Sequence, residues 1–245
     1  MVRKDFNGDM VCKNIINWIR EYFKGQPNAK GAIIGISGGK DSSVAAKLLV
    51  EALGKERVFG VLMPNGVQKD IDDSLRVVEI LGINYKIVNI EKAYNGLLEE
   101  IQENSLSIDA KINIPPRLRM TTLYALGANM HYRVCGTGNK SEGFVGYTTK
   151  WGDNAFDFNP IGDLTTEEVI AVGDALGLPY ELVHKTPNDG LSGRSDEEKL
   201  GFSYQQINEY IENGSCGNKE IDEKIKLKHE YNKHKRCLPI KYEQP

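Results

Sequence analysis

The sequence predicts an α/β protein with a parallel sheet and helices on both of its faces. Short apolar runs alternate with segments of helical periodicity between residues 31 and 135. The run 32–36 is almost wholly apolar, which is typical of a strand buried on both faces. Parallel neighbours also need helix-length connections, and the segments between the runs have that length.

The elements follow one another in a regular order. A helix is expected at 11–23, where isoleucines recur at helical spacing, and a Gly-Gln-Pro-Asn turn ends it. Strands are expected at 32–36, 58–62, 85–88 and 132–135, and further helices at 42–53, 71–81, 94–101 and 120–130. Beyond residue 145 the pattern becomes loops and short helices, ending in a charged helix at 219–235. We expect a single domain, 1–245, with its core sheet at about 30–145 and a C-terminal lobe at about 146–245.

Composition excludes several classes of protein. The 245 residues are 40% hydrophobic and 27% charged, which suits a folded core and not a disordered chain or a coiled coil. A net charge of −3 provides no basic field for nucleic acid. No apolar run approaches the roughly 20 residues that cross a membrane, and the charged start does not resemble a signal peptide. The four cysteines form no CxxC pair, so we expect reduced thiols in a cytoplasmic protein that binds neither membrane nor nucleic acid.

The loop after the first strand carries the sharpest signal. Small residues followed by a helix N-terminus make an anion site, for which phosphate is the natural guest. The loop is not a Walker sequence, because Ile34 stands where a glycine is required and Asp41 follows Lys40. The dinucleotide pattern G-x-G-x-x-G also fails, since Ser141 occupies the third glycine position of the later Gly-rich segment.

Ser-Gly-Gly-x-Asp-Ser after a first strand resembles the pyrophosphate loop of the ATP pyrophosphatases. A simple glycine turn capped by Ser42 would explain the glycines but not Asp41. An acidic side chain beside phosphates is repulsive unless a divalent cation lies between them, so we interpret Asp41 as a magnesium ligand.

Motifs along the rest of the chain resemble ammonia-dependent NAD synthetase, within the Rossmann-like ATP pyrophosphatase fold. They lie in order at 63–70, 136–142, 149–153, 157–161 and 234–236. The resemblance implies a ligase with ATP as co-substrate and Mg²⁺ as cofactor. In that reaction the nicotinate carboxylate of deamido-NAD attacks the α-phosphorus of ATP, pyrophosphate leaves, and ammonia displaces AMP to form NAD.

The resemblance also implies roles for individual residues. The residues expected to bind ATP are Ser37, Gly38, Gly39, Lys40, Asp41, Ser42, Ser43, Thr137, Thr166 and Asn188. Those expected to bind deamido-NAD are Arg117, Lys150, Asp157, His234 and Lys235. Asp41 and Glu142 are the expected metal ligands and, with Asp153, the catalytic group; Asp153 would capture ammonium and accept its proton.

Two positions depart from the family pattern. Thr166 stands where the family usually has a lysine that faces ATP, and Asn188 stands where many members have Thr or Ser. A replacement for the lost charge is expected from Lys185 in preference to Lys40, because the variable position of the loop motif generally points away from the nucleotide. The polar stretch 185–201 suits either a mobile lid or an ordinary surface loop.

The resemblance extends to partners. At 245 residues we expect no glutaminase domain, so free ammonia or a separate amidase would supply nitrogen. We also expect a homodimer with deamido-NAD at its interface, contacted through the opening helix and residues 117–130. The alternatives are another SGGxDS ATP pyrophosphatase, either GMP-forming or tRNA-modifying, and a non-catalytic adenine-nucleotide sensor. Another ATP pyrophosphatase should carry a basic RNA surface, cysteine pairs or a distinct dimerisation domain. A non-catalytic sensor would tolerate loss of Asp41 and Glu142, yet both are present.

Overall fold

Four parallel strands form the centre of the molecule. The computed structural model describes residues 3, 5–68, 71–102, 106–184 and 196–242. The strands are β1 (Gly31–Gly35), β2 (Val58–Leu62), β3 (Asn84–Ile87) and β4 (Tyr132–Val134). They are ordered β3-β2-β1-β4, and every neighbouring pair is parallel. The predicted parallel sheet and the positions of its strands are confirmed.

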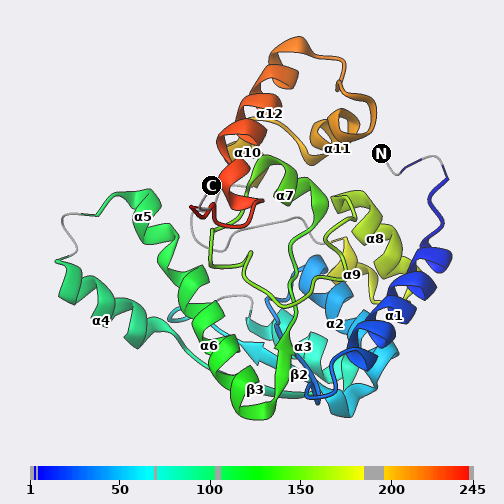
Figure 1. Ribbon diagram of the computed structural model, residues 1–245, viewed down its shortest axis with the longest axis vertical. Helices are drawn as coiled ribbons and strands as arrows, with labels where there is room; N and C mark the ends of the chain where they lie inside the picture. The colour runs from blue at the N-terminus through cyan, green and yellow to red at the C-terminus, as the bar shows by residue number, and fades with distance from the viewer. Residues whose placement is uncertain (1–2, 4, 69–70, 103–105, 185–195, 243–245) are drawn as a thin grey trace.

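Helices connect and surround these strands (Figure 1). In the first half they are α1 (Gly8–Lys24), α2 (Lys40–Leu53), α3 (Ile71–Leu81), α4 (Glu91–Ile101), α5 (Ile108–Ile112) and α6 (Ile114–Met130), with a short η1 (Lys55–Arg57). In the second half they are α7 (Lys140–Val145), α8 (Thr166–Ala175), α9 (Tyr180–Val183), α10 (Asp196–Leu200), α11 (Tyr204–Asn213), α12 (Lys219–Tyr231) and η3 (Lys233–Lys235).

Alternating side chains of β1 serve the two faces of the sheet. Ala32 and Ile34 belong to a core cluster shared with α1, α2, α3 and α8, whereas Ile33 packs with Leu123 of α6 in a second cluster. All of these side chains are buried. Since strand side chains alternate between faces, helices cover both sides, as an uninterrupted apolar strand requires.

Four helices, α1, α2, α4 and α6, begin earlier than the apolar periodicity indicates. Helix α1 starts at Gly8 because the Asn7 side chain accepts the Met10 amide at 2.9 Å and caps the first turn. Helix α6 starts at Ile114, six residues before the predicted start. Its prolines stand in the first turn, where a helix needs no amide donor from them.

The last helices gather beyond α7, at the top of the molecule in Figure 1. Their own apolar cluster joins Val145 of α7 to Ile207 of α11 and Ile225 of α12. Helix α8, by contrast, packs on α1 and α2 against the main core. In the described ranges, every helix is too short or too polar to cross a membrane.

Candidate active site

The loop between β1 and α2 is built to approach a ligand closely. Gly38 has φ +77°, and a Cβ there would lie 2.8 Å from the Asp73 Cβ of α3, so only glycine fits. The Ser37 and Ser42 hydroxyls lie 3.1 Å apart, and the Ser43 hydroxyl donates to the Gly39 carbonyl at 2.8 Å. Because Gly39 caps α2 without a side chain, no capping group screens the positive end of that helix.

A cluster of charges lies beside this loop. The Asp41 carboxylate accepts a hydrogen bond from the Asn139 amide at 3.1 Å and pairs with the Lys40 ammonium at 3.0 Å. Asn139 and Glu142 form a reciprocal capping box at the start of α7, with distances of 3.0 and 3.1 Å. The box holds Glu142 next to Asp41 although the two are about a hundred positions apart in the chain.

The electrostatics of the pair suit a divalent cation. Burial raises the pKa of Glu142 well above its ordinary value, the nearby Asp41 charge raises it further, and Lys40 opposes both. Two adjacent carboxylates are a donor set that Mg²⁺ accepts, and this ion usually keeps waters or substrate phosphates as its other ligands. The adjacent carboxylates of Asp41 and Glu142 fit such a partly filled site. The described ranges hold no group of three or more His, Cys, Asp or Glu that could enclose a metal by itself.

The side chain of Lys40, the variable residue of the loop motif, turns toward Asp41. Its side chain is only 6% exposed and its ammonium contacts Asp41. Thr166 is also buried; its backbone amide donates to the Ser141 hydroxyl at 3.1 Å and its own hydroxyl lies 3.5 Å from the Asn139 side-chain oxygen. Lys40 is thus connected to the Thr166 position through Asp41 and Asn139. Lys185 and Asn188 lie outside the described residues.

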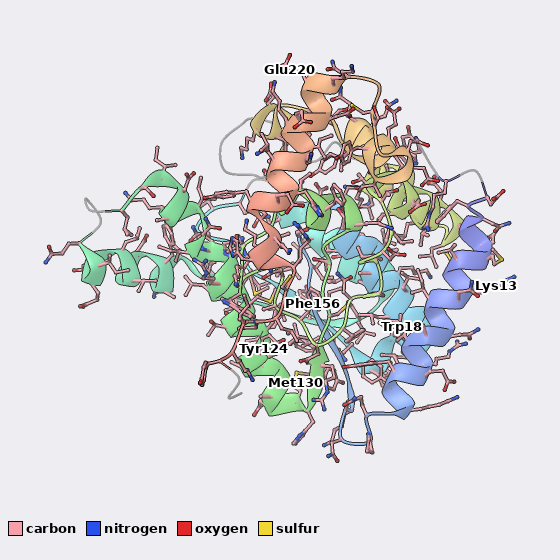
Figure 2. All side chains as sticks on the ribbon, turned by 45° about the horizontal axis from the view of Figure 1, so that its top comes forward. Lys13, Trp18, Tyr124, Met130, Phe156 and Glu220 are labelled. Atoms are coloured by element: carbon pink, nitrogen blue, oxygen red, sulfur yellow. The ribbon has the colours of Figure 1, made fainter. Side chains whose placement is uncertain are left out.

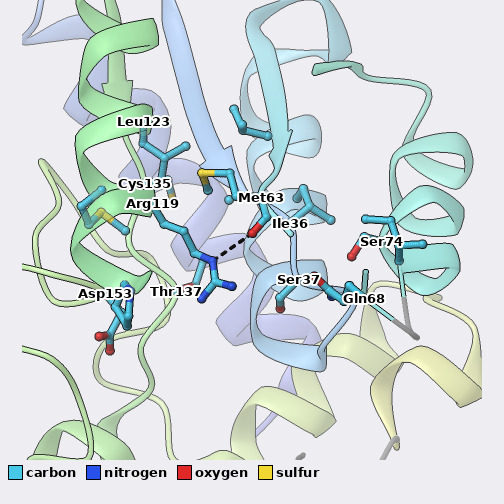
Figure 3. A pocket seen from close by; sticks show the side chains of 15 residues that line it. Ile36, Ser37, Met63, Gln68, Ser74, Arg119, Leu123, Cys135, Thr137 and Asp153 are labelled. Atoms are coloured by element: carbon cyan, nitrogen blue, oxygen red, sulfur yellow. Dashed lines mark hydrogen bonds between the residues drawn. The ribbon is translucent and has the colours of Figure 1, made fainter. Parts of the chain in front are cut away.

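A cavity of about 180 Å³ opens at the carboxyl ends of the strands (Figure 3). Ser37 and Thr137 line it with apolar side chains from β2 and α6, and Arg119 reaches into it from α6. The Arg119 Nε donates to the Met63 carbonyl oxygen at 3.0 Å, drawn as the dashed line in Figure 3. Apolar walls with a few polar groups are typical of a small-molecule site.

A second cavity of about 660 Å³ lies beside α1 and the residue 146–164 segment. Its lining includes the aromatic side chains Trp18, Tyr22, Trp151, Phe156 and Phe158, of which Trp18 and Phe156 are labelled in Figure 2. Three of the five residues expected to bind deamido-NAD line it as well: Lys150, Asp157 and Lys235. Aromatic faces and cations together suit a ligand with rings and phosphates.

The protein itself positions these polar side chains. The Lys150 ammonium lies 5.4 Å from the Trp151 ring centre. Asp157 accepts the Val134 amide at 2.8 Å, and the Lys235 ammonium donates to the Gly146 and Thr148 carbonyls at 2.8 and 2.7 Å.

The other two expected residues lie outside both of these cavities. Arg117 is exposed on α6 and donates through Nε to the Lys150 carbonyl at 3.2 Å. His234 is exposed in η3.

Asp153 lines both cavities. Its carboxylate accepts the Thr149 amide at 2.7 Å. Burial raises the pKa of Asp153 above its ordinary value, while hydrogen bonds from Thr149 and the charge of Lys235 hold it down. A ligand in either cavity therefore meets the same carboxylate.

Sequence reasoning assigned no role to two side chains of this site. Asn139, which orders both carboxylates, was detectable in principle because Asn followed three residues later by Glu is a capping-box signature. Arg119 gave no separate signal, since only the packing of α6 decides which of its arginines turns inward.

The site defines a nucleotide-binding α/β enzyme with an anion loop and a carboxylate pair. Residues 11–239 match the family model described as NAD synthase. Over 238 residues the chain is 37% identical to the NH(3)-dependent NAD(+) synthetase of Carboxydothermus hydrogenoformans, covering 95% of this chain and 97% of that one.

Two solved structures are similar over nearly the whole chain. The NMN synthetase of Francisella tularensis has a TM-score of 0.90 and 33% identity, covering 97% of this chain and 99% of that one. The NH3-dependent NAD synthetase of Campylobacter jejuni, solved with a nitrate ion, has a TM-score of 0.82 and 29% identity, covering 97% and 100%. The chain belongs to the NAD synthase family.

Proposed function

We propose that this chain is a ligase that forms NAD from deamido-NAD, ATP and ammonia. The nicotinate carboxylate attacks the α-phosphorus of ATP, the bond to pyrophosphate breaks, and ammonia then attacks the carbonyl carbon and releases AMP. The observation that carries the proposal is the convergence of the two cavities on Asp153, next to the loop that starts at Ser37. A site of this form holds two substrates with their reacting groups at one point.

The smaller cavity and the loop take ATP. Loop residues 37–43 and the N-terminus of α2 bind the departing pyrophosphate through amides and hydroxyls. Asp41 and Glu142 would hold Mg²⁺, which would supply positive charge against the phosphate oxygens. Their adjacency and the raised pKa of Glu142 support this assignment.

The larger cavity takes deamido-NAD. Lys150 and Lys235 are cations for a substrate with two phosphates, and the aromatic walls accept its rings. Asp153, held by Thr149 between the two cavities, attracts ammonium and accepts its proton. Burial keeps this carboxylate more basic than an exposed aspartate, which suits a proton acceptor.

We also propose a homodimer that covers the rim of the larger cavity. Trp18 is 47% exposed, Tyr124 38% and Trp151 55%, although large aromatic side chains favour burial. Trp18 lies on α1 and Tyr124 on α6, the two segments expected at the interface. Light scattering that gives a monomer mass at micromolar concentration would contradict this.

We also propose a separate amidase as a source of ammonia. Residues 1–245 are proposed to form a single domain.

A pyrophosphate-release assay tests the function. With ATP, Mg²⁺ and ammonium, release should depend on deamido-NAD and be absent with XMP or no acceptor, and NAD should appear in equal amount. Release that follows XMP, or that needs no acceptor, contradicts the proposal.

A second candidate is amidation of the mononucleotide form of the substrate. It is favoured by one observation, the TM-score of 0.90 to a protein described as an NMN synthetase. The carboxylate chemistry is the same, but the adenylyl half of the substrate is missing. Comparing kcat/KM for deamido-NAD and nicotinate mononucleotide in the same assay decides between them.

A further inference from the structure

Arg119 is a partly buried cation whose outer nitrogens face a cavity. Its Nε is fixed by the Met63 carbonyl at the end of β2, 3.0 Å away. In the described part of the chain the two terminal nitrogens make no hydrogen bond, and the side chain lines the smaller cavity. One edge of the guanidinium is therefore tied to the protein, and the other is open to a ligand.

Among the residues that the structure describes, the charge of Arg119 has no direct counter-ion. Burial lowers the pKa of its guanidinium, and Asp153 opposes this only through space. Desolvating a cation without a partner costs free energy. A neutral donor could make the hydrogen bond to the Met63 carbonyl without that cost, so this bond alone does not explain an arginine here. The position is explained if an anionic ligand completes the site.

Geometry identifies which anion fits. In the view of Figure 3 the guanidinium lies between Ser37, at the start of the anion loop, and Asp153, where the two cavities meet. If the loop holds the β- and γ-phosphates, the α-phosphoryl group must lie between the loop and the nicotinate carboxylate. That region contains the open edge of Arg119.

We propose that Arg119 is a catalytic residue that binds the α-phosphoryl group of ATP, and of the adenylated intermediate, through its two terminal nitrogens. The inference rests on the proposed function. Arg119 stays protonated and forms no covalent bond. The carboxylate oxygen bonds to the α-phosphorus, pyrophosphate leaves with the electron pair of the broken P–O bond, and the guanidinium donates to the two non-bridging oxygens.

Binding of AMP and adenosine isolates this contact, because the two ligands differ only by the α-phosphate. Calorimetry on the full chain should show that the wild type prefers AMP. In Arg119→Gln the ratio of AMP affinity to adenosine affinity should fall about tenfold or more, the usual effect of losing a charge-assisted pair. The affinity for adenosine should stay within about twofold of the wild-type value. Arg119→Lys should restore only part of it, since an ammonium cannot make the paired contact.

Arg57→Gln is the matched control. Arg57 also donates through Nε to a backbone carbonyl, that of Lys30 at 2.9 Å, but it is exposed and lines neither cavity. Its substitution should leave both affinities unchanged. The inference is overturned if the wild type has no preference for AMP, if Arg119→Gln retains the preference, or if that variant weakens adenosine and AMP equally.

Turnover gives an independent readout. Pyrophosphate release by Arg119→Gln should lose far more in kcat than in the KM for deamido-NAD, and equal losses in both contradict a role at the phosphoryl group. The proposed function fails separately. Suppose that the wild type shows the Arg119-dependent preference for AMP but makes no NAD. The α-phosphate contact then stands, and the NAD synthetase proposal is wrong.

Discussion

Replacing Glu142 by Gln removes a charge from the carboxylate pair without removing a hydrogen bond. The Glu142 carboxylate accepts the Asn139 amide at 3.1 Å to close the capping box of α7. Gln can make the same bond, and this chain already contains the example: Gln206 closes the capping box of α11 by accepting the Ser203 amide at 2.9 Å. The variant should therefore keep its fold.

The effect on activity should be large. A preorganised electrostatic group in the transition state is commonly worth about 2.7–4 kcal/mol, which corresponds to a loss of roughly 10²–10³ in kcat. Glu142 is one of only two carboxylates assigned to Mg²⁺, so we expect at least a 100-fold loss. Asp41→Asn should behave alike.

The effect on stability should have the opposite sign. Burial and Asp41 raise the folded-state pKa of Glu142, so its ionised form destabilises the folded state. This penalty is absent below the ordinary pKa of 4.5, grows as pH rises through the interval up to the raised pKa, and is complete above it. Glu142→Gln should therefore unfold at a higher temperature than the wild type at pH 8, with a smaller gain at pH 5.

Two assays decide the matter. NAD formation is measured with ATP, Mg²⁺ and ammonium, and thermal unfolding is measured without Mg²⁺ at both pH values. Gln206→Glu is the control, because it makes the reverse exchange in a capping box away from the site, and it should keep full activity. Activity of Glu142→Gln within a few-fold of wild type, or a lower unfolding temperature at pH 8, refutes the reasoning.

Three further predictions concern the same site. Asp153→Asn should lose most activity yet unfold at a higher temperature at neutral pH, because Asn can still accept the Thr149 amide and no buried charge remains; scanning calorimetry showing destabilisation contradicts this. If the Lys40 cation replaces the charge missing at Thr166, Lys40→Met should raise the KM for ATP about tenfold, and adding Thr166→Lys should reverse part of that increase. An unchanged KM for ATP in Lys40→Met means that Lys40 only neutralises Asp41. Ammonium should support NAD formation at a rate that rises with pH, as the neutral amine fraction grows, whereas glutamine should not; equal rates with the two nitrogen sources oppose an ammonia-dependent ligase.

The sequence determined the sheet because its signals are local. The apolar run that forms β1 and the Ser-Gly-Gly-x-Asp-Ser loop after it can be recognised within about a dozen residues. The parallel order of strands and helices follows from the lengths of the connections. The order of motifs also identified the family, which the comparison over residues 11–239 confirms.

Helix starts were harder to predict, for an equally local reason. Apolar periodicity reports only the part of a helix that packs on the core. The first turn of α6 contains two prolines and begins six residues before that periodicity.

Only the tertiary structure decided which distant groups of the site meet. Asp41 contacts Asn139 across 98 positions, and the Arg119 Nε reaches the Met63 carbonyl across 56. No spacing rule encodes such contacts, since they depend on strand order and on the rotation of α6 against the sheet. The buried Lys40 side chain, by contrast, pairs with Asp41, its neighbour in the sequence. The sequence by itself thus determined the residue types of the site. Packing between distant segments decided which of these side chains line the two cavities, with Asp153 between them, because side-chain direction is fixed by the whole fold.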